Sequence, residues 1–235
     1  MEDMKKVTVN GVDVYGPSSR DELIEFALSN NLILVAVNAE KIYNATDQTR
    51  EIINRNLGYP DGFGALVALR ENGVSDAVKI PGCELWLDIL DKHADDKSFY
   101  FIGGRPDTIN GTIDKVTKIY PNIKILGFRD GYFNEEQEVS LIDDILMTKP
   151  DIVFVALGSP RQEIFMEKVS KSHKALYQGL GGSFDVFVGN VKRAPQGWIK
   201  LNLEWLYRLI QEPKRVTRQA KLALYFLKIK LGLYK

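Results

Sequence analysis

Short runs of β-branched, aromatic and aliphatic residues recur along this chain, and each run ends at a glycine or a polar turn. The runs are Leu32–Val37, Phe99–Ile102, Ile123–Leu126, Ile152–Leu157 and Ala175–Leu180. Longer segments with helical lengths and spacings are Glu84–His93, Thr108–Ile119, Glu135–Met147 and Gln162–Ser170. Strands that alternate with helices predict an α/β fold: a Rossmann-like parallel sheet with helices on both faces.

The two ends of the chain depart from this alternation. Val7–Val14 is expected to form a hairpin or an edge element ahead of the first strand. At the other end, residues 214–231 have a helical pattern with Lys214, Arg218, Lys221 and Lys228 on one stripe. Most of the opposite side is apolar: Val216, Ala220, Leu224, Leu227 and Leu231. We therefore expect a body at residues 1–190 and a basic amphipathic helical appendage at 191–235.

Charge is distributed unevenly between these two parts. The whole chain is formally neutral, but the last 49 residues, from Phe187, hold 11 Lys or Arg and only two acidic residues. Trp198, Trp205 and Tyr207 in this stretch are residue types common at membrane interfaces. The appendage is predicted to lie on an anionic membrane surface. The alternative is an ordinary helix that packs its leucines on the body; nucleic-acid binding is disfavoured by the long aliphatic runs.

Composition excludes several classes of protein. The single cysteine, Cys83, rules out an internal disulfide, and with only His93 and His173 beside it a Cys/His metal site cannot be assembled. These three residues are interpreted as structural. The N-terminus lacks the apolar core of a signal peptide, and no window reaches about 18 uninterrupted apolar residues. The sequence predicts a cytoplasmic protein without a metal or cofactor.

The loops that follow the predicted strands carry the candidate chemistry. They are Asn38–Glu40, Gly103–Pro106, Gly158–Glu163 and Gly179–Ser183. Ligands of such sheets bind beyond the carboxyl ends of the strands, and glycine-bearing turns that open helices offer backbone N–H groups to an anion. No loop matches the dinucleotide fingerprint or the P-loop. The alternative explanation of each glycine is that it ends a strand for steric reasons alone. We predict nucleotide-phosphate binding among these loops.

Several segments, taken together, resemble the WecG/TagA/CpsF family of bacterial glycosyltransferases. They are Val37–Lys41, Tyr59–Gly62, Phe101–Gly104, Asp130–Phe133, Leu157–Glu163, Gly179–Val186, Lys192–Pro195 and Leu203–Leu209. The match spans about residues 30–235 in the family's order. Asn-Ala-Glu-Lys and Arg-Gln-Glu-Ile-Phe-Met look nearer the branch that transfers N-acetylmannosaminuronic acid.

The resemblance implies an inverting transferase that moves N-acetylmannosamine or its uronic acid from a UDP donor to polyprenyl-diphosphate-linked N-acetylglucosamine. Such an enzyme builds cell-surface polysaccharide and is attached peripherally to the inner face of the cell membrane. The body would bind the UDP-sugar, and the appendage would reach the membrane and complete the active site. A homo-oligomer that opens on the membrane is a further expectation. Another UDP-hexose donor and acceptor, for capsule or exopolysaccharide, is the nearest alternative; a dinucleotide-dependent oxidoreductase and a non-catalytic membrane adaptor are more distant ones.

The resemblance also assigns the catalytic residues. Asp61 matches the family's proposed base, which removes a proton from the acceptor hydroxyl; alternatively it caps the helix at Ala65–Val67 or orders a turn. Three arginines match positions thought to grip a diphosphate: Arg208, Arg215 and Arg218. Arg208 has an alternative ion pair with Glu204, and Arg218 an alternative contact with lipid headgroups.

A second set of residues is expected around the donor. It comprises Asn38, Gly103, Gly104, Tyr132, Gly158, Ser159, Gln162, Glu163, Gly181, Gly182 and Asp185. Tyr132 would stack on the uracil or else belong to the core. Asn38 is equally explained by a turn, Glu163 by a helix cap and Asp185 by ordering its loop.

Two departures from the family pattern bear on the acceptor. Ala36 stands where many members have threonine, and the chain between Asn38 and Asp61 is about three residues shorter than expected. The exact donor sugar, the linkage and the polysaccharide are not encoded in these short motifs.

Overall fold

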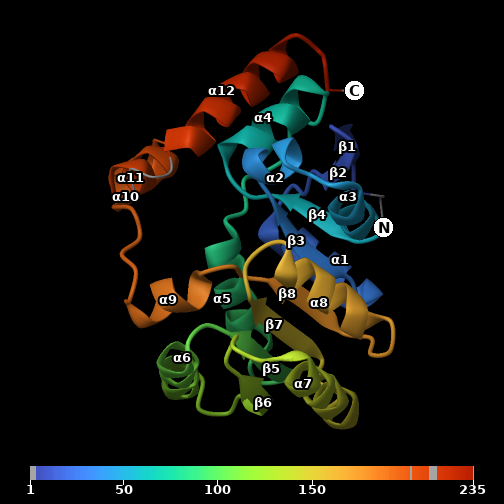
Figure 1. Cartoon of the computed structure of the whole chain (residues 1–235), viewed down its shortest axis with the longest axis vertical. Coiled ribbons are helices and arrows are strands. Elements are labelled where there is room, and N and C mark those ends of the chain that lie inside the picture. Colours follow the sequence, from blue (N-terminus) through green and yellow to red (C-terminus); the bar gives the residue numbers. More distant parts are fainter. Residues whose placement is uncertain (1–3, 202, 212–215, 235) are drawn as a thin grey trace.

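The computed structural model describes residues 4–201, 203–211 and 216–234. A six-stranded sheet runs through the molecule in the order β4-β3-β8-β7-β5-β6, and every neighbouring pair is parallel (Figure 1). Its strands are β3 (Ile33–Val37), β4 (Leu57–Pro60), β5 (Ser98–Gly103), β6 (Lys124–Arg129), β7 (Ile152–Ala156) and β8 (Leu176–Gly179). The predicted α/β class with a parallel sheet is confirmed.

A separate hairpin precedes the sheet. Strands β1 (Lys6–Val9) and β2 (Val12–Tyr15) pair antiparallel across a turn at Asn10 and Gly11, both with positive φ. Such two-residue turns match the right-handed twist of the strands they join. The expected hairpin at the N-terminal end is therefore present.

Helices connect the strands and cover both faces of the sheet. They are α1 (Arg20–Asn30), α2 (Ala39–Tyr43), α3 (Asp47–Asn54), α4 (Phe63–Glu71), α5 (Gly82–His93), α6 (Pro106–Ile119), α7 (Glu135–Thr148), α8 (Arg161–Ser170), α9 (Ser183–Val188), α10 (Gln196–Lys200), α11 (Glu204–Gln211) and α12 (Val216–Lys230). Local chemistry sets several starts: Thr46 and Asn134 form capping boxes, and Pro106 opens α6. The four predicted helices correspond to α5, α6, α7 and α8, with ends that agree within two residues.

The core consists of two apolar layers, one on each face. One lies beneath α1, α5, α6 and α9 and includes Trp86, whose ring meets Phe154, Phe184 and Phe187 edge-on. The other lies beneath α2, α4, α7 and α8 and also receives Tyr225 and Ile229 from α12. Burying each such aromatic side chain contributes about 1.5–3 kcal/mol. The C-terminal helix is thus part of the packed structure.

Figure 1 shows how the C-terminal segment returns to the body. After α9 the chain runs in an extended path to α10 and α11, and α12 then lies along α2 and α4. Residues 214 and 215, with which the predicted helix begins, fall outside the described residues.

Candidate functional site

All six parallel strands end at one edge of the sheet, so the loops that follow them lie side by side. Asn38 follows β3, Asp61 follows β4, and Gly104 follows β5. The edge is continuous because neighbouring loops bond to each other: Asp61 N–H to Val37 O at 2.8 Å, and Gly131 N–H to Gly104 O at 2.8 Å. The loops that the sequence predicted to meet beyond the carboxyl ends of the strands therefore do lie in one region.

Glycines shape this edge in two different ways. A Cβ at Gly103, where φ is 123°, would overlap the backbone of Ala156, so this glycine permits close approach of β5 and β7. By contrast, a Cβ at Gly158, Gly181 or Gly182 would meet no atom within 4 Å. The predicted glycines after β7 and β8 thus border open space, as a loop that receives a ligand must.

Asp61 points toward the start of α5. The N–H of Gly82 donates to Asp61 Oδ1 at 3.3 Å, and the carboxylate is half-buried. Helix α4 has Gly62 as its N-cap and no side-chain cap bond. The alternative in which Asp61 caps the helix at Ala65–Val67 is therefore wrong.

The C-terminal helix contacts the turn that carries Asp61. Tyr225, which is fully buried, donates from its hydroxyl to Gly64 O at 3.2 Å, and the Phe226 ring lies 6.5 Å from that of Phe63. A Cβ at Gly64 would lie 3.5 Å from the Tyr225 ring. The bend after β4 and the cationic C-terminal segment lie on the same side of the molecule.

A second connection joins the C-terminal segment to α5. Arg193 and Arg20 both donate to the carboxylate of Glu84, in the first turn of α5. Burial alone would raise the pKa of Glu84, but the two guanidinium groups lower it below its ordinary value. Burial raises the pKa of the adjacent Cys83 thiol to about 11, against the opposing effect of Arg193. Cys83 is thus an inert thiol beside Asp61, in agreement with its structural interpretation.

The three arginines expected to complete the site are only partly described. Arg208 belongs to α11 and Arg218 to α12, but their side chains lie outside the described structure, as does all of Arg215. Of these two helices, α12 contacts α4 just after Asp61, through Tyr225 and Gly64.

Asn38 and Asp185 make local contacts. Asn38 caps α2 by accepting from the N–H of Lys41 at 2.9 Å. Asp185 accepts from the hydroxyl of Thr108 at 2.9 Å and from Asn190 at 3.5 Å. Asn38 therefore orders its own turn, as the alternative interpretation expected, whereas Asp185 connects α9 to Thr108 of α6 and to Asn190. Both side chains are half-buried at the strand-end edge.

Gln162 and Glu163 lie buried beneath the edge. Glu163 forms a 2.7 Å ion pair with Lys41, and Gln162 donates to Glu163 and accepts from the N–H of Gly181. Burial would raise the pKa of Glu163, but Lys41 lowers it, so the carboxylate is ionised. Ser159 also contributes to this stabilisation. The cluster ties together the loops after β3, β7 and β8.

Tyr132 stands at the outer end of the edge and is 66% exposed. It follows Asp130 in a turn in which the Asp130 carboxylate accepts the Tyr132 N–H at 2.8 Å. Arg161 braces this turn by donating to Gly131 O and by lying over the Phe133 ring. The alternative that Tyr132 belongs to the core is wrong.

The family comparison agrees with this arrangement. The glycosyl transferase model WecG/TagA/CpsF matches residues 7–233. The chain belongs to this family. It is therefore a glycosyltransferase, which decides against the oxidoreductase and the non-catalytic adaptor. The match also extends to the N-terminal hairpin, beyond the residues that carried the resemblance.

Several residues of this transferase site were missed by sequence reasoning. Tyr59, Gln178, Lys41, Glu84 and Arg193 all lie within the network around the strand ends. Arg193 lay in Lys192–Pro195, one of the segments that carry the resemblance, but no role was predicted for it. Tyr59 and Lys41 also lay in segments that carry the resemblance, again without an assigned role. Glu84 and Gln178 had no signal of their own; a buried polar residue in a short strand, such as Gln178, looks like any half-buried position.

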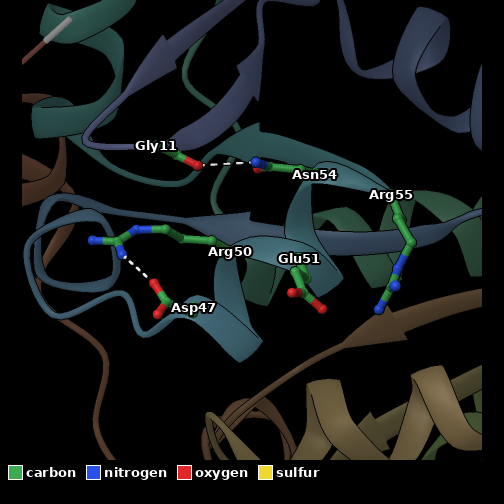
Figure 2. Close-up of a pocket in the computed structure, with 6 residues that line it drawn as sticks. All are labelled: Gly11, Asp47, Arg50, Glu51, Asn54 and Arg55. Atoms are coloured by element: carbon green, nitrogen blue, oxygen red, sulfur yellow. Dashed lines mark hydrogen bonds and ion pairs between the residues drawn. The ribbon is translucent and has the colours of Figure 1, made fainter.

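A surface hollow of about 510 Å³ lies elsewhere, between the hairpin and α3 (Figure 2). Three of its four charged side chains have partners in the protein: Arg50 pairs with Asp47, and Arg55 pairs with Glu167. Asn54 donates to Gly11 O at 2.9 Å. With these groups paired inside the protein, the hollow offers little to a substrate.

The C-terminal helices leave apolar side chains in solvent. On α12, Leu224 and Leu227 are 49% and 54% exposed, and Leu231 directly after the helix is 61% exposed, whereas Tyr225 and Ile229 face the body. The alternative in which these leucines pack on the body is therefore wrong. Further exposed apolar residues of the segment are Val191, Leu201, Trp205, Ile210 and Leu233. Lys228 of the predicted basic stripe lies over the rings of Tyr43 and Tyr234.

A search of the described residues found no helix that is both long and apolar enough to cross a membrane. Within the same ranges, no group of three or more His, Cys, Asp or Glu side chains is placed to hold a metal ion.

Proposed function

We propose that this enzyme is an inverting glycosyltransferase that transfers ManNAcA or ManNAc from UDP to a polyprenyl-diphosphate-linked GlcNAc. The family supplies the reaction class, and the donor and acceptor are inferred from the motifs around Asn38 and Gln162. The observation that carries the proposal is the contact between Tyr225 of α12 and Gly64, three residues after Asp61. It joins a candidate base and a cationic segment beside the strand ends.

In this mechanism Asp61 acts as the base. Its carboxylate takes the proton of the acceptor hydroxyl while that oxygen bonds to the anomeric carbon from the side opposite the diphosphate. The bond from the anomeric carbon to the UDP oxygen breaks, and UDP leaves with the electron pair. The N–H of Gly82 holds one carboxylate oxygen and so helps to fix the orientation of the carboxylate.

The departing diphosphate requires positive charge and N–H donors. The glycine loops at Gly158 and Gly181–Gly182 border open space and offer backbone N–H groups. Arg208, Arg215 and Arg218 are proposed to supply the cations, since guanidinium groups match phosphate geometry. Tyr132, exposed beyond β6, is proposed to stack on the uracil.

The lipid-linked acceptor suggests why the C-terminal segment is amphipathic. We propose that residues 191–235 rest on the cytoplasmic face of the membrane, with the exposed leucines of α12 among the acyl chains and cations at the headgroups. Each cation near an anionic surface contributes about 1 kcal/mol. The attachment is peripheral, and it holds the strand-end edge near the acceptor.

One feature favours a second candidate donor and acceptor. Ala36 lies beside Asp61's partner Gly82, since a Cβ on Gly82 would be 3.4 Å from Ala36 Cβ. A small apolar residue here changes the lining of the site, which fits another UDP-hexose used for capsule or exopolysaccharide.

A donor screen tests the proposal. Purified full-length enzyme is mixed with single UDP-sugars and a short-chain lipid-diphosphate GlcNAc acceptor, and products are read by mass spectrometry. We expect UDP-ManNAcA or UDP-ManNAc to give a product of inverted anomeric configuration by NMR, and Asp61→Asn to form that product far more slowly. Transfer from another UDP-hexose alone supports the second candidate, and a retained configuration contradicts the mechanism.

A further inference from the structure

A small buried polar cluster lies beneath Asp61. Tyr59 of β4 and Gln178 of β8 lie on either side of β3 and are both completely buried. Their side chains meet over β3: Gln178 Nε2 donates to Tyr59 Oη at 3.4 Å and to Gly82 O at 3.4 Å. The two strands are thereby connected to the first turn of α5.

Gly82 links this cluster to Asp61. Its carbonyl accepts from Gln178, and its N–H donates to Asp61 Oδ1 at 3.3 Å. The contact is tight, because a Cβ at Gly82 would lie 3.0 Å from Tyr59 Oη. The start of α5 therefore rests on the Tyr59 hydroxyl, and the position of the N–H that holds Asp61 follows from it.

This arrangement is not the most stable one that the core allows. Gln178 is fully buried, and its Oε1 has no hydrogen-bond partner among the described atoms. An unsatisfied buried polar atom costs about 1–3 kcal/mol, whereas an apolar residue of similar size would avoid that cost. A polar residue retained at such a position indicates a use other than stability.

We propose that Tyr59 and Gln178 are positioning residues, which fix Gly82 so that its N–H holds the Asp61 carboxylate in the orientation needed for proton transfer. The inference rests on the proposed function, in which Asp61 is the base. Hydrogen bonding to a carboxylate, here at a helix N-terminus, favours its ionised form. Loss of either side chain therefore loosens the base and favours its protonation.

Other titratable and charged groups near this cluster are Cys83 and Glu84 on α5, Glu163 on α8, and Arg193 and Glu204 from the C-terminal segment. The Cys83 thiol stays protonated below about pH 11. The two glutamates with a lowered pKa, Glu84 and Glu163, are ionised at neutral pH. Cys83, Glu84 and Glu163 therefore each keep one protonation state through neutral pH.

The test compares Tyr59→Phe and Gln178→Met with Tyr177→Phe. Tyr177 is the matched control because it is also fully buried and its hydroxyl donates to His173 O at 3.1 Å, away from Asp61. Tyr59→Phe and Gln178→Met are each expected to lower kcat about 10- to 100-fold, as loss of a supporting contact does. KM for the UDP-sugar should change less than about threefold, and the acidic limb of the pH–kcat profile should move to higher pH.

A second readout does not depend on turnover. The amide NMR signal of Gly82 is expected to shift in Gln178→Met and to stay in place in Tyr177→Phe. If both site variants keep the kcat and acidic limb of Tyr177→Phe, or lose only thermal stability, the positioning role is wrong while the proposed function stands. Turnover retained in Asp61→Asn would instead remove the base, and with it both proposals.

Discussion

The hydroxyl of Tyr225 and the carbonyl of Gly64 are joined by a 3.2 Å hydrogen bond across 161 residues of sequence. The bond attaches the C-terminal helix to the turn that carries Asp61. Ile229 and Phe226 add apolar contact on the same side of the helix. Removal of the segment should therefore alter the site while leaving most of the core intact.

Truncation after Gly197 tests this attachment. Most of both core layers lies before this residue, so the shortened chain is expected to fold, with transferase activity reduced at least about 100-fold. Circular dichroism and UDP binding check the fold, and product formation checks the activity. Full activity of the truncated chain would show that the helix is dispensable.

Replacing the candidate base should separate chemistry from binding. Asp61→Asn keeps the size of the side chain and an oxygen that can accept the N–H of Gly82, but it cannot take a proton. Turnover is expected to fall about 10²- to 10⁴-fold, while the Kd for UDP changes little. Calorimetry with UDP and a product assay measure the two effects; loss of UDP binding would point to a structural role.

The exposed leucines of α12 should control membrane binding. The triple change Leu224→Ser, Leu227→Ser and Leu231→Ser removes about 1.5–3 kcal/mol of apolar transfer per residue. Flotation with vesicles that contain anionic lipid is expected to drop to background, with unchanged melting temperature. Ile119→Ser and Met147→Ser form the control, because both side chains are at least half-exposed on other helices.

Substitution of glycine by alanine is expected to cost very different amounts of stability at two positions. Gly103→Ala should destabilise the protein by several kcal/mol, because the new Cβ overlaps Ala156 at a positive φ. Gly182→Ala places the same methyl in open space at φ −95°, so about 0.5 kcal/mol or less is expected. Urea unfolding measures both; equal losses would contradict the packing described at β5 and β7.

The ion pairs of Glu84 predict a pH dependence. Its pKa is lower in the folded state, so the unfolded state binds the proton more tightly. The stabilisation of the folded state by these ion pairs is complete above the ordinary glutamate pKa of about 4.3. It is lost as the pH falls through the lowered pKa that Glu84 has in the folded state. Protease cleavage between α9 and α10 should therefore accelerate in wild type only in acid.

Arg193→Gln should produce the same effect at neutral pH. Loss of the ion pair with Glu84 is expected to cost about 1 kcal/mol. This raises about fivefold the population of molecules in which the segment between α9 and α10 has detached from α5, so cleavage at pH 7 should rise by that factor. Lys92→Gln is the control, since Lys92 pairs with Asp21 and Glu25 on the body. Equal cleavage of both variants would mean that Arg193 does not hold the segment.

The sequence predicted much of the fold because strong local patterns coincide with the elements. Five of the six sheet strands and the hairpin lie where apolar runs predicted them. Strand β4 was missed, since Leu57–Pro60 is short and contains both glycine and proline, which strands disfavour. Gly58 is explained only in three dimensions: a Cβ there would lie 2.6 Å from Asp13 O.

The site was predicted less completely, for a physical reason. Parallel strands share one carboxyl edge, so the gathering of the loops at Asn38, Gly104 and Gly158 follows from the pattern. The contact between Gly82 and Asp61 does not follow from the pattern, because Gly82 lies 21 residues away at a helix start with no special sequence. Likewise, the contact between Tyr59 and Gln178 depends on the strand order, which places β4 and β8 on either side of β3 and cannot be read from local sequence.

Helix α12 has one side sealed against α4 and another side open, and this division has a consequence for regulation. The medium around Leu224 and Leu227 acts on a helix whose other side contacts Gly64, three residues after Asp61 in the sequence. With the helix on a membrane, as proposed, the output of the enzyme should vary with the lipids beneath it, through their charge and chain packing, even at saturating donor. The bilayer would act on this transferase as an effector as well as a location.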